Sequence, residues 1–252
     1  MKVCLSFDDG RIDSFFTAYK ALKNSKLTAS FHITTGFVDF TYISNDFGNG
    51  RKPLTKDNLL EMHGNNMDIS SHGDRHIMDA NDFSTSIKKL SSWGIKKPKY
   101  GFSIPNSKYC SDELKLFYDG YKKDILYIRG GRNPSCYSFK SKINYVLYKL
   151  FHFYRCYKQF NEPNLLNSIN KDLLFSLVVK KHTKVSDLIR FIDDYKETDK
   201  TLILMFHSIV ENPTDDWEWG EASFMKLCSF LANNKSIIET LSIEELVKNE
   251  KK

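Results

Sequence analysis

Short apolar runs alternate with amphipathic stretches along this chain, and that alternation is the feature that most restricts its fold. Seven runs have the length and residue types of buried strands: Val3 to Phe7, Thr28 to Ile33, Met67 to Ser71, Lys99 to Ser103, Ile125 to Ile128, Leu173 to Val179 and Leu202 to Phe206. Six stretches have helical periodicity: Asp13 to Asn24, Lys56 to Gly64, Ser84 to Trp93, Ser111 to Tyr121, Ser186 to Tyr195 and Glu221 to Asn233. This order predicts an α/β fold, a distorted (β/α) barrel with about seven parallel strands joined by right-handed crossovers.

Length, charge and cysteine content set wider limits. The 252 residues suit a single domain over 1–252, with a helical insertion at about 133–172 where the connection is long for a barrel loop. The net charge of +6 is spread along the chain, so we expect no nucleic-acid partner. The five cysteines show neither metal-binding nor redox spacing and indicate free thiols in a reducing compartment. Met1-Lys2 leads directly into the first strand without room for a signal peptide, which predicts a cytoplasmic protein.

Two adjacent carboxylates, Asp8 and Asp9, end the first strand candidate just before Gly10. In a parallel barrel the carboxyl ends of the strands meet at one rim, where the chemistry of such folds takes place. Paired carboxylates repel each other and lose hydration unless a cation or a proton lies between them. A solvated Asp-Asp-Gly turn is the plain alternative. The choice depends on what the other strand ends carry.

Histidines follow two further strand candidates. His72 and His76 come after the run that ends at Ser71, and two imidazoles four residues apart can converge on one cation. His207 follows the apolar run Leu202 to Phe206, which makes it a candidate acid for a leaving group, although a lone histidine there is more often structural. Two histidines and one carboxylate at one rim predict an open site for zinc or a similar divalent ion.

These three strand ends, in this order, resemble the polysaccharide deacetylases of carbohydrate esterase family 4, which include chitin, chitooligosaccharide and peptidoglycan deacetylases. The family's first motif, Thr/Ser-Phe-Asp-Asp-Gly, matches Ser6 to Gly10. Its second motif, His-Ser/Thr-x-x-His, matches His72 to His76 with Gly73 at the hydroxyl position. Its last motif, Leu-x-His, matches Met205 to His207 with methionine in place of leucine. The resemblance covers nearly the whole chain in order and spacing.

The resemblance implies a role for each residue. Asp9, His72 and His76 would hold a divalent metal, with zinc expected and cobalt, nickel or manganese as alternatives. Asp8 would be the base that deprotonates the attacking water, and His207 would protonate the departing amine. The reaction would remove N-acetyl groups from an amino-sugar glycan, a glycan precursor or a lipid-linked glycan. The alternatives are a non-sugar C–N amide hydrolase and a catalytically impaired, glycan-binding relative.

Two family motifs are incomplete in this chain. In the third, Arg-x-Pro-aromatic, Ser103 replaces the arginine that pairs with the base, while the backbone N–H of Asn106 can still serve an oxyanion. The fourth, Asp-x-x-Asp-Trp, which orients the catalytic histidine, is missing. Arg129 and Arg132 follow the fifth strand candidate. Either could supply the missing charge near Asp8, or both could face solvent or bind a substrate anion.

Aromatic and apolar side chains mark two other segments. The insertion carries an apolar stripe at helical spacing, flanked by basic residues: Ile143, Val146, Leu147, Leu150, Phe151 and Tyr154. We expect this helix to pack on the barrel, and the alternative is a weak membrane-surface contact through about 140–158. Trp217 and Trp219 are candidate sugar-stacking rings, or they cover the barrel edge. His32 lies in a strand pattern and is expected to be structural.

Overall fold

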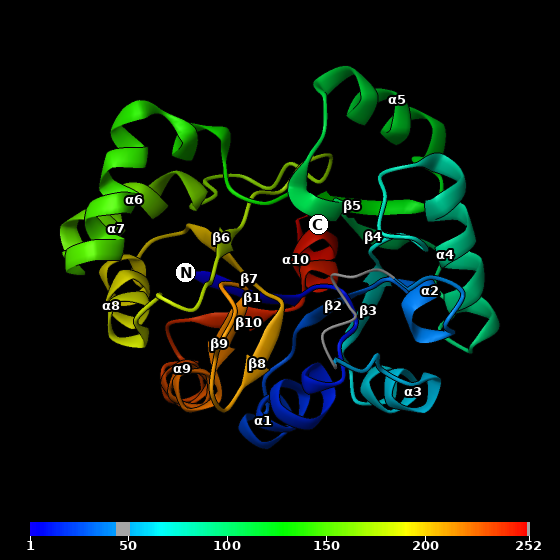
Figure 1. Cartoon of the computed structure of the whole chain (residues 1–252), viewed down its shortest axis with the longest axis horizontal. Helices are drawn as coiled ribbons and strands as arrows, with labels where there is room; N and C mark the ends of the chain where they lie inside the picture. Colours follow the sequence, from blue (N-terminus) through cyan, green and yellow to red (C-terminus); the bar gives the residue numbers. More distant parts are fainter. Residues whose placement is uncertain (44–50, 251–252) are drawn as a thin grey trace.

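The computed structural model describes residues 1–43 and 51–250. Its main sheet contains β1 (Lys2–Phe7), β2 (Ser30–Ile33), β3 (Asp68–Ser71), β4 (Tyr100–Ser103), β5 (Ile125–Arg129), β6 (Leu177–Val178), β7 (Thr201–Phe206) and β10 (Glu239–Leu241). The order is β5-β4-β3-β2-β1-β7-β6, β10 pairs with β1, and the neighbouring strands run parallel. The curled parallel sheet in Figure 1 confirms the predicted distorted (β/α) barrel.

A short segment around β6 lies between the two edges of the curled sheet. Leu174 forms a parallel bridge with Arg129 of β5, and β6, a few residues further along, pairs with β7. At β1 the pairing is divided, because β10 pairs with its first half while β2 pairs only with Ser6 and Phe7. This divided pairing distorts the barrel and leaves the carboxyl ends of its strands at one rim.

Helices cover the outside of the sheet (Figure 1). Those expected from the sequence are α1 (Lys20–Ser25) with the π-helical Ser14–Tyr19 before it, α3 (Lys56–Gly64), α4 (Ala80–Ser92), α5 (Ser111–Tyr121), α8 (Val185–Tyr195) and α9 (Glu221–Asn233). Five short elements were not predicted from the sequence: α2 (Thr35–Val38), α10 (Ile243–Asn249), the paired strands β8 (Ser208–Val210) and β9 (Glu218–Gly220), and β10. Each is too short to give a clear hydrophobic period.

Three phenylalanines fix the carboxyl ends of β1 and its neighbours. Phe7 stacks on Phe31 of β2, with ring centroids 4.8 Å apart, and on Phe206 of β7 at 5.2 Å. Phe7 also meets Phe224 of α9 edge-on, so it points outward to the helical layer. Because successive side chains of a strand point to opposite faces, the next residue, Asp8, is directed into the barrel.

The insertion contains α6 (Phe139–Phe151) and α7 (Tyr154–Asn161), with 3-10 turns at Pro134–Tyr137 and Glu162–Asn164. The expected packing of α6 on the barrel is confirmed, since Tyr148 belongs to the main hydrophobic core. The apolar stripe is not the buried face, because Ile143, Val146 and Leu150 are 44%, 51% and 65% exposed. The buried face is formed by Ser141, Asn144 and Tyr148. Tyr148 decides this orientation, since its hydroxyl donates to Asp187 of α8 and accepts from the backbone N–H of Lys184.

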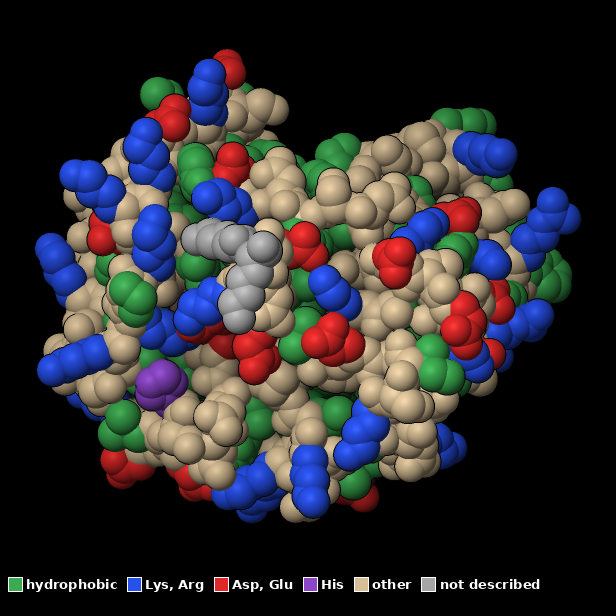
Figure 2. Space-filling view, turned by 180° about the vertical axis from the view of Figure 1, so that it is seen from behind, with side chains coloured by type: hydrophobic (Ala, Val, Ile, Leu, Met, Phe, Trp, Pro, Cys, Tyr) green, Lys and Arg blue, Asp and Glu red, His purple; other side chains and the backbone are tan. Residues whose placement is uncertain are grey.

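Charged side chains of both signs are intermixed on the face of the molecule that Figure 2 shows. On the face in Figure 2, Lys and Arg side chains lie around the whole outline and alternate with Asp and Glu. Over the residues that the structure describes, no helix has both the length and the apolar character needed to cross a bilayer.

A buried polar cluster lies inside the barrel below the rim. Asp68 of β3 is 5% exposed and accepts hydrogen bonds from Ser30, Ser70 and the Tyr127 hydroxyl. Lys97 pairs with the same carboxylate at 2.5 Å and also with Glu244 of α10. Burial alone raises the pKa of Asp68, but Lys97 outweighs it and holds that pKa below its usual value.

Lys97→Met tests the contribution of this pair to stability. We expect a loss of about 3 kcal/mol in the free energy of unfolding at pH 7, because Asp68 is left as an uncompensated buried charge. The difference from wild type should shrink as the pH falls, since protonation of Asp68 removes the same interaction from the wild-type protein. Urea unfolding measures both quantities. Lys96→Met, at an exposed neighbour, is the control and should change stability by less than about 0.5 kcal/mol; equal losses would contradict the prediction.

Candidate active site

The strand ends bring most of the predicted residues into one cavity of about 490 Å³. The predicted residues that line it are Asp8, Asp9, His72, His76, Asn106, Arg132, His207 and Trp217. They come from the ends of β1, β3 and β7 and from the loops after β3, β4, β5 and β8. The shared rim that the parallel barrel predicts therefore exists, while Arg129 and Trp219 lie outside the cavity lining.

The backbone after β1 separates the two adjacent carboxylates. Asp8 still belongs to the strand ladder, since its N–H donates to the Phe206 carbonyl at 3.0 Å. Asp9 has a φ of +78°, a left-handed conformation that is unusual for a residue with a side chain. The turn gives the two side chains different partners, so one can bind a cation while the other is held apart from it.

Asp9, His72 and His76 have the geometry of a metal site. The Nε2 atoms of His72 and His76 are 3.1 Å apart, and Asp9 Oδ1 lies 3.5 Å from the first and 3.7 Å from the second. Ligands about 2.1 Å from a tetrahedral ion lie about 3.4 Å from one another. The three donor atoms thus fit a zinc-type ion and leave positions open for water and substrate.

Neighbouring groups prepare these donors. The His72 Nδ1 lies 2.9 Å from the Ser103 carbonyl, which can only accept, so Nδ1 carries the proton and Nε2 faces the site. Arg11 donates from Nε to Asp9 Oδ2 at 2.9 Å, which leaves Oδ1 toward the histidines. Burial and the adjacent His72 lower the pKa of His76 to about 4 and favour its neutral, ligating form.

Asp8 forms a buried ion pair with Arg129. The Nη2 of Arg129 contacts Asp8 Oδ1 and donates to Ser103 Oγ at 2.6 Å, and that hydroxyl lies 3.3 Å from Asp8 Oδ2. Burial opposes ionisation of Asp8, but the Arg129 guanidinium beside it outweighs this effect and holds the pKa of Asp8 well below its usual range. Arg129 is 0% exposed, so it can support Asp8 but cannot touch a substrate.

His32 lies behind Asp8. Its Nδ1 is 3.5 Å from Asp8 Oδ1 and 3.2 Å from Ser6 Oγ, and its Nε2 is 3.0 Å from the Tyr127 hydroxyl. The single proton of that hydroxyl goes to Asp68, so His32 donates from Nε2 and accepts from Ser6 at Nδ1. His32 therefore links the predicted base to the buried cluster around Asp68, a contact that its sequence position gave no signal for.

His207 is held by an aromatic ring instead of a carboxylate. Its ring centroid lies 4.6 Å from that of Trp217. The Lys180 ammonium lies 4.1 Å from the centroid of the same Trp217 ring. Among the described residues, the His207 Nδ1 has no hydrogen-bond partner. Burial lowers the pKa of His207, against the opposing effect of Asp9 and Asp8. Trp217 thus lies where the missing fourth motif would act.

Other predicted residues need correction or addition. Trp219 is 2% exposed, packs on Phe206 and donates its indole N–H to the Thr183 carbonyl, so it is a core residue and not a sugar-stacking ring. Asn106 stays at the cavity with a φ of +56°. Arg11 was not predicted as a site residue, although its position two residues after Asp9 indicated that it could pair with this carboxylate.

The fold and the cavity together define a parallel barrel with an open Asp-His-His centre beside a separately paired carboxylate. Residues 1–117 match the family model described as polysaccharide deacetylase. No curated protein matches the chain. The resemblance predicted from the motifs is confirmed by this match together with the fold.

Three solved structures share the fold over nearly the whole chain. A family 4 carbohydrate esterase from Bacillus anthracis has a TM-score of 0.53 at 14% identity, covering 98% of this chain and 82% of that one. A family 4 acetyl xylan esterase from Clostridium thermocellum, in complex with a cobalt ion, has a TM-score of 0.52 at 13% identity, covering 99% and 91%. The peptidoglycan deacetylase PdaC from Bacillus subtilis has a TM-score of 0.51 at 9% identity, covering 99% and 92%.

Exchanging two residues tests the support of Asp8. Ser103 and Arg129 are register partners on β4 and β5. We expect Arg129→Ser to lower acetate release about 100-fold, because the predicted base loses its cation, while metal content stays near wild type. The double variant S103R/R129S returns a guanidinium from the adjacent strand and should recover at least part of the activity and of the lost thermal stability. If the folded double variant is as inactive as the single one, the guanidinium is not what Asp8 needs.

Proposed function

We propose that the protein is a metal-dependent hydrolase that removes N-acetyl groups from an acetylated amino-sugar glycan or glycan precursor. One observation carries the proposal: a single cavity holds a metal-type Asp9-His72-His76 triad next to a second carboxylate with its own cation. The matches to polysaccharide deacetylases support an acetyl-removing hydrolase that acts on glycans.

The chain's own residues supply the proton transfers. Asp8, kept ionised by Arg129, accepts a proton from the attacking water, whose oxygen forms the new bond to the acetamide carbon. A divalent ion held by Asp9, His72 and His76 would acidify water and polarise the carbonyl. Asn106 lines the cavity, and its backbone N–H would donate to the oxyanion. Protonated His207 gives its proton to the amine as the C–N bond breaks, and acetate and a free amine leave.

The contact between Arg129 and Asp8 also bears on the alternatives. The absence of the third-motif arginine suggests a catalytically impaired relative. Arg129, however, supplies the same positive charge to Asp8. This favours an active enzyme. A hydrolase of non-sugar C–N bonds would use identical groups, and only substrate tests separate it from the proposed deacetylase.

Metal identity and cellular location are proposed on chemical grounds. A set of two imidazoles and one carboxylate suits zinc, and the cobalt-bound esterase supports cobalt as a working substitute. We propose a cytoplasmic protein, supported by five cysteines that are all free thiols in the structure. A glycan precursor or lipid-linked glycan would then be the substrate.

Metal removal tests the proposed activity. EDTA should abolish acetate release from N-acetylated chitooligosaccharides, and added zinc should restore it, because the triad is the proposed metal site. Asp8→Asn should keep the metal but lower turnover about 1000-fold, whereas Asp9→Ala should lose the metal. Metal analysis and acetate assays give both readouts. Acetate release that survives EDTA would refute metal dependence, and bound metal without turnover on any amide would favour a non-catalytic relative.

We further propose that α6 contacts an anionic membrane surface. Residues 133–161 contain five basic residues, Lys140, Lys142, Lys149, Arg155 and Lys158, and no Asp or Glu. The apolar side chains exposed on this segment are Phe139, Ile143, Val146, Leu150, Phe151 and Phe153. Exposed apolar groups surrounded by cations are the composition of helices that lie on membranes.

Vesicle sedimentation tests this contact. At low salt we expect the protein to bind vesicles of phosphatidylcholine with phosphatidylserine, and the variant Ile143→Ser/Leu150→Ser to bind about tenfold more weakly, since it loses two apolar contacts. Leu116→Ser is a matched control, because Leu116 is 74% exposed on α5, away from this segment. Equal binding by both variants, or no binding by the wild type, would rule out the proposed surface.

A further inference from the structure

Arg132 is a partly buried cation in the cavity of the proposed active site. Its side chain lines this cavity together with Asp8 and His207. The guanidinium carbon lies 5.1 Å from the ring centroid of Phe160 and 5.7 Å from that of Tyr145, so two rings of the insertion cover it. Burial lowers the pKa of Arg132, and the groups that oppose this shift are tyrosines and a cysteine, with no carboxylate among them.

Most of the hydrogen-bond donors of Arg132 have no acceptor in the described part of the chain. A guanidinium carries five N–H groups. One from Nη2 reaches the Val178 carbonyl at 3.1 Å, and Nε is buried with no partner among the residues described. Burying an unpaired cation with unused donors is unfavourable unless an anion completes it. The missing partner therefore has negative charge and several acceptor oxygens.

The other arginines at this cavity already have carboxylate partners. Arg11 pairs with Asp9, and Arg51 pairs with Glu218. Lys108 also lines the cavity, and no carboxylate lies within ion-pair distance of it in the regions that the structure describes. Among the described residues, partly buried Arg132 and exposed Lys108 both line the cavity without a carboxylate partner, which suits a phosphate group.

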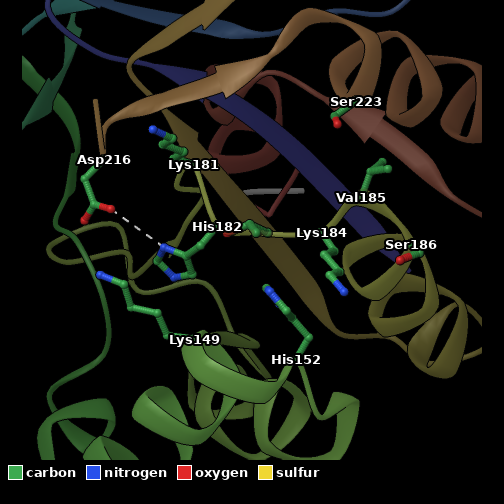
Figure 3. Close-up of a pocket in the computed structure, with 10 residues that line it drawn as sticks. Lys149, His152, Lys181, His182, Lys184, Val185, Ser186, Asp216 and Ser223 are labelled. Atoms are coloured by element: carbon green, nitrogen blue, oxygen red, sulfur yellow. Dashed lines mark ion pairs between the residues drawn. The ribbon is translucent and has the colours of Figure 1, made fainter. Parts of the chain in front are cut away.

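A second cavity, of about 700 Å³, is lined by His182 (Figure 3), whose ring centroid lies 5.4 Å from that of Tyr145. Lys149, Lys181 and Lys184 line it, but these lysines are exposed to solvent. Its carboxylate, Asp216, is paired with Lys180 at 3.1 Å and lies 3.8 Å from His182. This second cavity adds positive potential beside the active site, but its lysines are exposed, so the partly buried Arg132 remains the specific feature.

We propose that Arg132, assisted by Lys108, binds a phosphate group of the substrate. The substrate is then an acetylated amino sugar that carries a phosphate ester near its acetamide, and this assignment rests on the proposed function. The planar fork of the guanidinium matches two phosphate oxygens, and stacking on Phe160 and Tyr145 holds it in that orientation. The phosphate belongs either to a soluble sugar phosphate or to a lipid-linked sugar, which have this chemistry in common.

A substrate pair tests the subsite. N-acetylglucosamine 1-phosphate and methyl N-acetylglucosaminide differ in the anionic group but share the acetamide. In Arg132→Met the ratio of kcat/KM for the phosphate over the neutral glycoside should fall at least tenfold, mainly through KM. Arg190→Met is the matched control: Arg190 also stacks on a tyrosine of the insertion, Tyr154 at 4.1 Å, but lies outside the cavity. An unchanged ratio in Arg132→Met would overturn the proposal.

Direct binding separates this proposal from the proposed activity. Calorimetry with N-acetylglucosamine 1-phosphate should show at least tenfold weaker binding to Arg132→Met than to wild type. If neither substrate is deacetylated but this loss is seen, the subsite stands and the proposed function fails. If deacetylation is seen but binding does not depend on Arg132, the subsite fails alone. A vesicle assay with the same sugar phosphate on a farnesyl chain identifies the source of the phosphate. Turnover that depends on Arg132 only in the vesicles supports a lipid-linked substrate, whereas Arg132-dependent turnover of the soluble sugar phosphate supports a soluble substrate.

Discussion

The buried ion pair between Asp8 and Arg129 is the interaction on which the candidate site depends. Both side chains are almost fully buried, and a carboxylate in that place would lose its charge without a cation beside it. The same guanidinium contacts Ser103 Oγ and the sulfur of Met205. It therefore joins β5 to β1, β4 and β7 at the rim. One contact sets the charge of the proposed base and holds together the strand ends that surround it.

The second carboxylate owes its separate role to the backbone. A positive φ at Asp9 turns its side chain away from Arg129 and toward His72 and His76, while Arg11 occupies its outer oxygen. His76, Asn106 and Ser107 also have positive φ values, so four residues of one cavity adopt backbone conformations that side chains normally disfavour. Such strain persists where the surrounding structure fixes the geometry, and it occurs here at the residues assigned to the metal and the oxyanion.

The insertion contributes to the cavity and to the outer surface at once. Tyr145 and Phe160 of α6 and α7 cover Arg132 from behind, whereas Ile143 and Leu150 face outward. The orientation of α6 follows from the hydrogen bonds of the buried Tyr148 hydroxyl. Leaving a buried polar group without partners costs more free energy than exposing a leucine side chain to water. The phosphate of a lipid-linked sugar would then contact Arg132 beneath α6 and α7, while its lipid would contact the outward face of α6.

Local patterns in the sequence were enough to predict the barrel and the grouping of Asp8, Asp9, His72, His76 and His207, because the hydrophobic period of a strand is local and parallel strands must end at one rim. Three features needed the tertiary structure. The arginine that supports Asp8 depends on the register of β4 with β5, which places Arg129 beside Ser103. The divergence of Trp217 and Trp219 depends on where β9 begins, because Trp217 precedes the strand and contacts His207, whereas Trp219 lies within the strand and packs on Phe206. The outward face of α6 depends on its hydrogen bonds to α8. Each involves a partner distant in the chain, and periodicity carries no information about such partners.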